Sequence, residues 1–296
     1  MPDLRDMELL VALAHHRHFA RAADASAISQ PAFSARIRNM ELTLGVPIVQ
    51  RGNRFQGFTP EGETVLKWAR RVLSDMDGLR QELDAARGML TGTLSIGVVP
   101  TALAHVARIP ALIRADHPGL SIRIYALSTG AIHRGLEDFS LDAGVGYLDA
   151  DMPRALAPAE LLYEERYVLL APPALAPRSE GTATWAEAAA LPLCLLTGDM
   201  RNRRFLDDVF TTHTGAAPAP VLETNDLLVM LAQVDSGASA TIAPALLADS
   251  LALGPDTIRL PLADPDVRTP IGLLTIRRDP VPAALTALAR ALRAQP

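Results

Sequence analysis

The residues whose types could read a nucleic acid lie close together near the N-terminus. Gln30, Ser34 and Arg38 follow one another at intervals of four residues, so they form one polar stripe on a helix, with Arg36 farther round. Gln pairs with adenine edges, Arg with guanine or phosphate, and Ser with either. A three-helix bundle with a solvated polar face would show the same stripe, so the stripe alone leaves both interpretations open.

Hydrophobic spacing predicts three short helices that would position this stripe. The first is indicated by apolar residues at helical spacing, namely Met7, Leu10, Val11 and Ala14. A second helix fits Phe19 to Ala25, and a third begins at Pro31 and ends at Gly45. Its apolar stripe, next to the polar one, consists of Phe33, Ile37, Met40 and Leu44. Three helices of which the last carries short polar side chains and arginines suit helix-turn-helix insertion into the major groove.

Residues 46–55 read as two short strands around a Gly-Asn turn. Such a wing would bring Arg51 and Arg54 to phosphates or into the minor groove. The local charge agrees with this. The chain of 296 residues has a net charge of −5, which by itself argues against DNA binding, but residues 17–54 hold six arginines against two acids.

Thr59 and Pro60 open a long helix with an N-cap and a proline at the first helical position. Its apolar positions repeat every 3.5 residues over three heptads: Val65, Ala69, Val72, Met76, Leu79, Leu83 and Ala86. This period favours a coiled-coil seam between two copies of the chain, and the alternative is a helix that lies on its own domain.

After a flexible joint at 88–92, the pattern changes to alternating strands and helices. Strands are indicated at 94–99, 121–127, 142–147, 167–171, 193–196, 221–223, 240–243 and 271–276, and the last strand with a Leu285, Leu288, Leu292 helix is expected to return to the first lobe. Such alternation predicts parallel sheets with ligand-binding loops at the carboxyl ends of the strands. Candidate ligand contacts at strand exits are Pro100, Thr101, Ser128, Thr129, Gly146, Thr197, Arg201 and Asn225. Hydroxyls and N–H groups there suit a small anion, although each hydroxyl alone could be a helix cap. Of the arginines at 201, 203 and 204, two are expected to be solvated.

Other chemistry is poorly supported. The single cysteine, Cys194, excludes an intramolecular disulfide and a cysteine-cluster metal site, and its apolar neighbours indicate a buried thiol. His15, His16 and His18 lack a spaced partner for a metal, and the sequence contains no catalytic motif, so we expect no metal, no cofactor and no enzymatic activity. No apolar run approaches the ~20 residues that cross a bilayer, and the N-terminus does not resemble a signal peptide, which predicts a soluble, cytoplasmic protein without membrane contact. The alternative function is an enzyme or a plain binding protein acting on a small organic acid.

The N-terminal segment resembles the winged helix-turn-helix of LysR-type transcriptional regulators. The matching positions are Ala22-Ala23, Ile28 to Ser34, Ile37-Arg38, Glu41, Leu44 to Val46, Arg51 and Phe58 to Gly62. By this resemblance Gln30, Pro31 and Ser34 are recognition-helix positions and Arg54 is a wing arginine. The family commonly has Arg-Gln after the serine, whereas this chain has Ala35-Arg36, so the readout is expected to differ.

The resemblance also implies the overall organisation. A DNA-binding domain (1–58) and a linker helix (59–90) would precede a two-lobed α/β effector domain (91–296) similar to periplasmic binding proteins, with lobe I at 91–162 and 267–296 and lobe II at 163–266. It implies a dimer of dimers, a transcription factor for double-stranded DNA that works with RNA polymerase. The stretches 78–82 and 136–144 resemble a subgroup linked to formate dehydrogenase genes, so formate or another small carboxylate is the expected effector. Peroxide-sensing relatives carry two cysteines where this chain has Arg201 and Phe210, so no thiol switch is expected.

Overall fold

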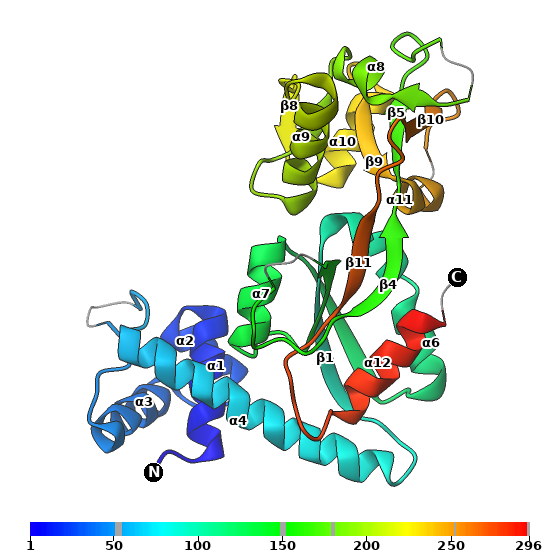
Figure 1. Ribbon diagram of the computed structural model, residues 1–296. Coiled ribbons are helices and arrows are strands. Elements are labelled where there is room, and N and C mark those ends of the chain that lie inside the picture. Colours follow the sequence, from blue (N-terminus) through cyan, green and yellow to red (C-terminus); the bar gives the residue numbers. More distant parts are fainter. Residues whose placement is uncertain (51–54, 149–151, 179–180, 252, 295–296) are drawn as a thin grey trace. The chain divides into compact units, whose positions relative to one another are not determined.

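The computed structural model describes residues 1–50, 55–148, 152–178, 181–251 and 253–294 (Figure 1). Contacts divide the chain into two units. The N-terminal unit is Met1–Gly92 with Glu137–Ser140, and the C-terminal unit is Thr93–Leu136 with Leu141–Pro296. In the described part of the chain, no helix is both long enough and apolar enough to cross a bilayer.

The described part of the N-terminal unit contains the helices α1 (Leu4–His16), α2 (Phe19–Ala25), α3 (Gln30–Leu44) and α4 (Pro60–Ala85). These confirm the helices expected from the sequence. Ser29 caps α3 by accepting a hydrogen bond from the N–H of Ala32, and Gly45 ends that helix with a φ of 71°, a left-handed conformation that favours glycine.

The buried residues of the N-terminal unit differ in part from the apolar stripes predicted from the sequence. On α1 the fully buried residues are Leu9, Leu10 and Leu13, while the expected Met7, Val11 and Ala14 are only partly buried. The stripe was misplaced because α1 packs against α2, α3 and α4 together, which covers more than one face. Phe33, Ile37 and Met40 are buried on α3 as expected, but Leu44 at its end is exposed.

Helix α4 starts against the wing. Thr59 caps it by accepting from the N–H of Gly62 at 2.9 Å, and its own hydroxyl donates to the carbonyl of Pro47 at 2.6 Å. Gly62 lies so close to the backbone of the preceding loop that an added Cβ would stand 2.0 Å from the carbonyl oxygen of Ile48. Glycine is therefore required at this position because backbone, and not a flexible side chain, occupies the space.

Replacing Gly62 by Ala is expected to destabilise the N-terminal unit by about 1–3 kcal/mol, since α4 must move away from residue 48 to admit the methyl group. Urea unfolding followed by circular dichroism measures this loss. Glu63→Ala, at an exposed position on the same turn, is the matched control and should change little. Equal unfolding midpoints for Gly62→Ala and the wild-type protein would contradict the close approach.

Lobe I of the C-terminal unit is built on a five-stranded sheet in the order β2-β1-β3-β11-β4. Its elements are β1 (Gly92–Val98), η1 (Pro100–Ala102), α5 (Leu103–Val106), α6 (Ile109–Asp116), β2 (Leu120–Ala126), α7 (Thr129–Glu137), β3 (Ala143–Tyr147), β4 (Glu160–Glu165), β11 (Thr269–Leu274) and α12 (Ala283–Arg293). The pairing of β11 with β3 and β4 confirms that the chain returns to the first lobe.

Lobe II contains a four-stranded sheet in the order β6-β10-β5-β9 and a two-stranded sheet of β7 and β8. Its elements are β5 (Tyr167–Ala171), β6 (Ala183–Thr184), α8 (Trp185–Ala189), β7 (Cys194–Leu196), α9 (Arg201–Thr214), β8 (Leu222–Thr224), α10 (Leu227–Asp235), β9 (Thr241–Pro244), α11 (Ala245–Ser250) and β10 (Ile258–Ala263). Trp185 and Phe210 are fully buried in its core. Two strand connections link the lobes, β4 to β5 and β10 to β11 (Figure 1).

The expectation of parallel sheets is confirmed for some strand pairs and wrong for others. β1 pairs in parallel with β3, and β7 with β8, as expected. However, β11 is antiparallel to both β3 and β4, and β5 is antiparallel to β9 and β10. The chain crosses to lobe II through β4 and β5 and returns through β10 and β11. The two crossing strands in each lobe therefore run in opposite directions.

Candidate DNA-reading face and interlobe pocket

The exposed side of α3 carries the predicted base-reading residues. Gln30, Pro31 and Arg38 are exposed and Ser34 is half-buried, while Phe33, Ile37 and Met40 hold the opposite side of the helix in the core. Within the described residues, the side chains of Gln30, Ser34 and Arg38 make no hydrogen bond to other parts of the protein. They are available to a ligand along one face, which we call the α3 face.

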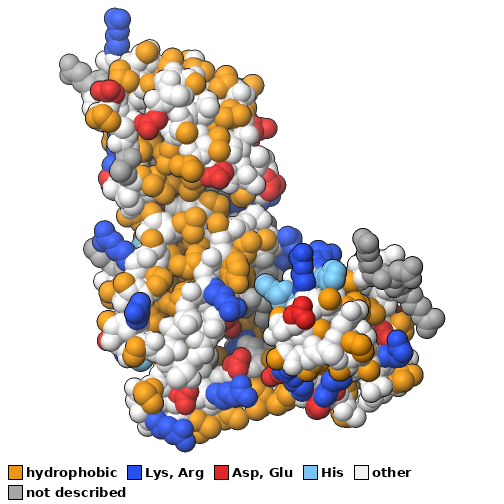
Figure 2. Space-filling model, turned by 180° about the vertical axis from the view of Figure 1, so that it is seen from behind, with side chains coloured by type: hydrophobic (Ala, Val, Ile, Leu, Met, Phe, Trp, Pro, Cys, Tyr) orange, Lys and Arg blue, Asp and Glu red, His pale blue; other side chains and the backbone are white. Residues whose placement is uncertain are grey.

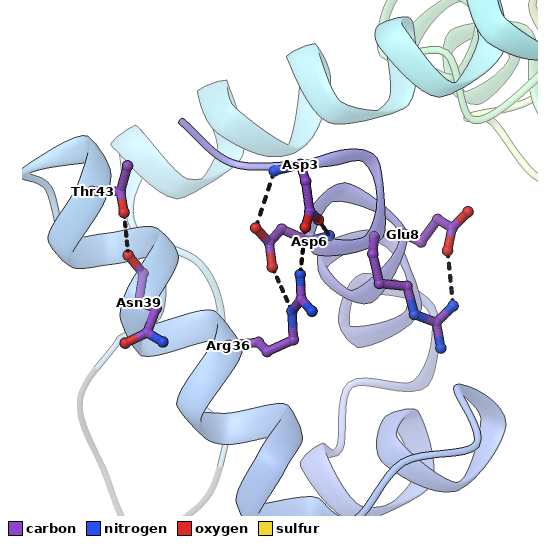
Figure 3. A network of polar contacts seen from close by, with 7 residues as sticks. Asp3, Asp6, Glu8, Arg36, Asn39 and Thr43 are labelled. Carbon is purple, nitrogen blue, oxygen red and sulfur yellow. Dashed lines mark hydrogen bonds and ion pairs between the residues drawn. The ribbon is translucent and has the colours of Figure 1, made fainter.

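Arg36 is used within the protein. Its Nε lies 2.7 Å from Asp6 and its Nη2 lies 2.8 Å from Asp3, as Figure 3 shows. These two acids form the capping box at the start of α1, in which each side chain accepts from the other residue's backbone N–H. The pair therefore ties α3 to α1, and Arg36 is a weaker candidate for a DNA contact than Arg38.

The wing arginines Arg51 and Arg54 lie outside the described residues. The frame of the wing is described on either side of them: Val49 pairs antiparallel with Phe58, and the N–H of Gln50 donates to the carbonyl of Gly57 at 2.9 Å. Glu41 on α3 accepts from the N–H groups of Ile48 and Val49, at 2.7 and 3.1 Å. This carboxylate fixes the start of the wing to the α3 helix.

In the C-terminal unit, loops from both lobes enclose a small pocket, which we call the interlobe pocket. It occupies about 210 Å³ including its open mouth. Its lining residues are Val99, Pro100, Thr101, Ser128, Thr129, Tyr147, Leu196, Met200, Arg201 and Asn202. The structure thus brings together five of the sequence-based candidates: Pro100, Thr101, Ser128, Thr129 and Arg201.

Three other candidates are not among the lining residues. Asn225 is exposed, and the hydroxyl of Thr197 donates to Asp199 at 2.6 Å. Gly146 precedes the lining residue Tyr147, but its α-carbon faces Val99, where a Cβ would stand at 3.2 Å. Gly146 lies within β3 and Thr197 directly follows β7, and each is the immediate neighbour of a lining residue, Tyr147 or Leu196. Asn225 follows β8, none of whose residues lines the pocket.

Two buried polar groups of the pocket have no hydrogen-bond partner in the described structure. They are the hydroxyl of Thr129, at the first residue of α7, and the Nδ2 of Asn202, in the first turn of α9. Both residues are more than nine-tenths buried. Met200, the N-cap of α9, offers no side-chain cap to that helix's first N–H groups. Unpaired buried donors beside two helix N-termini and the guanidinium of Arg201 suit a small anion.

The sequence did not point to Tyr147 or Asn202. Tyr147 is the last residue of β3, and its hydroxyl lies 2.7 Å from that of Thr101. Burial raises the pKa of Tyr147 well above its ordinary value, and the charge of Glu165 adds to this rise. The strand-exit position of Tyr147 was a usable signal; Asn202 had none, because it stands in a run of arginines.

That run of arginines is only partly solvated. Arg204 is exposed, but Arg203 is buried, pairing with Asp207 at 2.8 Å and with Glu223. Its Nη1 also donates to the carbonyl of Leu196 at 3.0 Å. Arg203 therefore joins α9 to β7 and β8, which contradicts the expectation that two of the three arginines are solvated.

Nothing in the described residues gathers three or more potential metal ligands. On the face in Figure 2, the acidic side chains of lobe II (upper part, red) stand apart among hydrophobic and uncharged groups. Cys194 is fully buried, which confirms the sequence-based expectation, and burial raises the pKa of its thiol.

Comparisons with known proteins agree with this arrangement. Residues 4–63 match the family described as bacterial regulatory helix-turn-helix protein, lysR family, and residues 87–296 match the LysR substrate binding domain. The DNA-binding transcriptional dual regulator OxyR of Escherichia coli (strain K12) is 29% identical over 99% of this chain and 95% of its own length. The HTH-type transcriptional regulator BenM of Acinetobacter baylyi is 30% identical over 91% of this chain and 88% of its own.

Solved structures share the fold. A full-length OxyR variant from Pseudomonas aeruginosa has a TM-score of 0.79 at 23% identity, covering 100% of this chain and 99% of the other. Full-length CbnR in complex with its target DNA has a TM-score of 0.71 at 21% identity, covering 98% and 99%.

A helix-turn-helix unit followed by a two-lobed α/β unit with a small pocket defines a DNA-binding transcription regulator with an effector-binding domain. The chain belongs to the LysR family of bacterial transcription regulators. The matching relatives are regulators and not enzymes, which removes the alternative of an enzyme acting on a small acid.

Proposed function

We propose that this regulator responds to a small carboxylate bound in the interlobe pocket, and that formate is the first ligand to test. The observation that carries the proposal is the pair of buried, unpartnered groups on Thr129 and Asn202, since a bound anion would satisfy both. Arg201 in the lining adds a positive charge that would balance the anion.

The size of the pocket favours a ligand with few non-hydrogen atoms. The 210 Å³ includes open solvent at the mouth; the enclosed space is only about 10 Å³, and Val99, Leu196 and Met200 line it with apolar side chains. Formate has one carboxylate and no further carbon, so it suits a site where polar groups meet within such a space. The resemblance of residues 78–82 and 136–144 to the formate-linked subgroup supports the same choice.

Some relatives bear the name hydrogen peroxide-inducible genes activator. A peroxide response through an intramolecular disulfide is not available to this chain, because Cys194 is its single cysteine and is fully buried. Sensing through a noncovalently bound effector therefore fits this chain better than sensing through a thiol switch.

Calorimetric titration of the full-length protein with sodium formate, acetate and propionate tests the proposal. Formate is expected to bind, and Thr101→Val and Asn202→Ala to weaken its binding at least tenfold, by leaving the carboxylate without a donor. Asn225→Ala is the matched control, since that residue is exposed and is not among the lining residues. Absence of binding by all three acids, or loss in the Asn225 variant alone, would contradict the proposed site.

For the ligand to affect DNA binding, the protein must assemble so that two DNA-binding domains act together. We infer a dimer formed through α4, further assembled as a dimer of dimers, that recognises double-stranded operator DNA through the α3 face and acts with RNA polymerase in the cytoplasm. The N-terminal half of α4 packs Leu66 and Ala69 on its own unit, whereas Leu79 and Leu83 farther along are about half exposed. Apolar side chains at heptad spacing support a second copy as the partner.

Replacing both Leu79 and Leu83 by Asp is expected to reduce the oligomer by at least one assembly step, because four charges would face one another in each dimer seam. Light scattering after size-exclusion chromatography gives the mass. Arg80→Ala, an exposed position on the same helix, should leave the mass unchanged. If the Leu79, Leu83 variant keeps the wild-type mass, α4 is not the seam.

A further inference from the structure

A buried carboxyl group stands directly behind the interlobe pocket. Glu165 ends β4, where the chain crosses from lobe I to lobe II, and is only 2% exposed. Its Oε2 accepts from the hydroxyl of Tyr147 at 3.3 Å and from that of Tyr167 at 3.4 Å. Tyr147 in turn shares a 2.7 Å hydrogen bond with Thr101. Since Tyr147 and Thr101 line the pocket, a chain of hydroxyls joins Glu165 to any bound ligand.

The charge on Glu165 decides which group donates and which accepts in each of these hydrogen bonds. An ionised carboxylate only accepts, so Tyr147 donates to it, and Thr101 donates either to Tyr147 or to the carboxylate, which it also faces. In that state the Thr101 oxygen shows the pocket only lone pairs, which repel an anion. A protonated carboxyl group donates to Tyr147 instead, and Tyr147 can then donate to Thr101. The hydroxyl hydrogen of Thr101 is then no longer donated to Tyr147 and can point into the pocket.

We propose that the interlobe pocket takes up its small carboxylate together with one proton, which Glu165 holds and which turns the Thr101 hydroxyl into a donor through Tyr147. This inference rests on the proposed function, because it concerns the same pocket and the same class of ligand. Glu165 acts here as a positioning residue that does not touch the ligand. The ligand binds as an anion and the proton comes from solvent, so the pair enters as the equivalent of a neutral acid.

The surroundings of Glu165 favour this exchange. The groups facing Glu165 are Thr101 from η1, Tyr147 from β3, Tyr163 from β4 and Tyr167 from β5. Behind them, Thr269 from β11 and Asn202 from α9 contact Tyr167. The ring of His105 of α5 packs at a tilt against that of Tyr163, at 4.6 Å between ring centres, and burial lowers the pKa of His105, which disfavours a positive charge there. No cation pairs with Glu165 in the described parts of the chain, and its Oε1 has no hydrogen-bond partner there.

An unpaired carboxylate in such a place is costly to ionise. Burial raises the pKa of Glu165 from its ordinary 4.5 to about 7, and the surrounding hydroxyls offset part of that rise. An anion bound nearby would raise it further by charge repulsion. Around neutral pH the empty pocket would therefore hold this proton about half the time, and the occupied pocket nearly always.

Titration calorimetry with sodium formate at pH 6 and pH 8 tests the inference on the full-length protein. With the pKa of the empty protein near 7, the wild-type affinity is expected to be about tenfold weaker at pH 8. At pH 7, in two buffers of different ionisation enthalpy, formate binding should take up about half a proton. Formate itself stays ionised throughout this range.

Two variants separate the proton-linked role from a structural one. Glu165→Gln is neutral at every pH and its amide can donate to Tyr147, so its affinity should be the same at both pH values and exceed that of the wild-type protein at pH 8. Tyr147→Phe removes the hydroxyl that joins Glu165 to Thr101 and should reduce the pH dependence, even if its affinity falls. Glu164→Gln is the matched control: Glu164 is exposed, pairs with Arg268 at 3.3 Å, and should keep the wild-type profile.

The possible results lead to different conclusions. Formate binding by the wild-type protein that is independent of pH, or a Glu165→Gln profile identical to the wild-type one, overturns the proton-linked uptake and leaves the proposed function standing. Absence of formate binding at both pH values overturns the proposed ligand and the proton-linked uptake together. If Glu165→Gln does not fold, the pH profile of Tyr147→Phe decides between the first two outcomes.

Discussion

Glu165→Gln is expected to gain stability relative to the wild-type protein as the pH rises from 5 to 8. In the folded chain burial holds the pKa of Glu165 at about 7, whereas in the unfolded chain it returns to about 4.5. The folded state therefore binds this proton more tightly, so wild-type stability falls as pH rises between these two values and levels off above about pH 7. The interval between the two pKa values corresponds to about 3 kcal/mol. Gln has no such titration.

Urea unfolding curves of both proteins at pH 5, 6, 7 and 8, followed by circular dichroism, measure this difference. Other titrating groups cancel because they are common to both chains. Glu164→Gln changes the same charge at an exposed position and should follow the wild-type curve. A constant difference between wild-type and Glu165→Gln stability over this range would mean that Glu165 is ionised in the folded protein at pH 5.

Ser34→Ala and Gln30→Ala are each expected to weaken binding to the cognate operator by about 1–3 kcal/mol while leaving the fold unchanged. Both side chains lie on the α3 face without partners in the described protein, so removing them costs no internal contact. Fluorescence anisotropy with labelled operator at fixed salt measures the affinity, and the same titration on unrelated DNA gives the non-specific part.

Arg36→Gln is the informative comparison on the same helix. Because Asp3 and Asp6 hold Arg36, this variant should lower the melting temperature of the N-terminal unit while the folded protein keeps its operator affinity. Unchanged affinity in both Ala variants would remove Ser34 and Gln30 from the readout. A specific loss of affinity in Arg36→Gln would instead restore Arg36 as a DNA contact.

The N-terminal unit was largely predictable because its signals are local. The cap at Ser29, the glycine at 45 and the proline at 60 mark helix limits by the chemistry of one or two residues. The role of Arg36 was not predictable. Its acidic partners are about thirty residues away in the sequence, and the residue type alone is equally suited to phosphate.

The C-terminal unit was predictable in its alternation but not in its pairing. Strand β4 was missed because three of its six residues are glutamates, a composition typical of a loop. One of these, Glu165, is buried opposite Thr269 of β11 by pairing across more than one hundred residues. The pocket shows the same limit: strand exits identified Thr101 and Thr129 and were a usable signal for Tyr147, whereas Asn202 reaches the pocket through the tertiary fold.

The division of charge along the chain now has a structural counterpart. The six arginines of residues 17–54 are not equivalent, since Arg36 is used internally and Arg38 is exposed on α3. Because the protein has a low net charge, its non-specific DNA binding should be weak. Recognition should depend on a few base contacts and on the spacing of the DNA-binding domains in the oligomer.

The most direct test of the central claim is operator binding with and without the effector. Full-length protein is titrated against labelled DNA from upstream of its own gene, in the absence and presence of sodium formate, and compared with Thr101→Val. We predict that the wild-type protein binds this DNA specifically and that formate changes its affinity, whereas Thr101→Val binds equally well and does not respond. A formate response that survives in Thr101→Val, or no specific binding by the wild-type protein, would contradict the account.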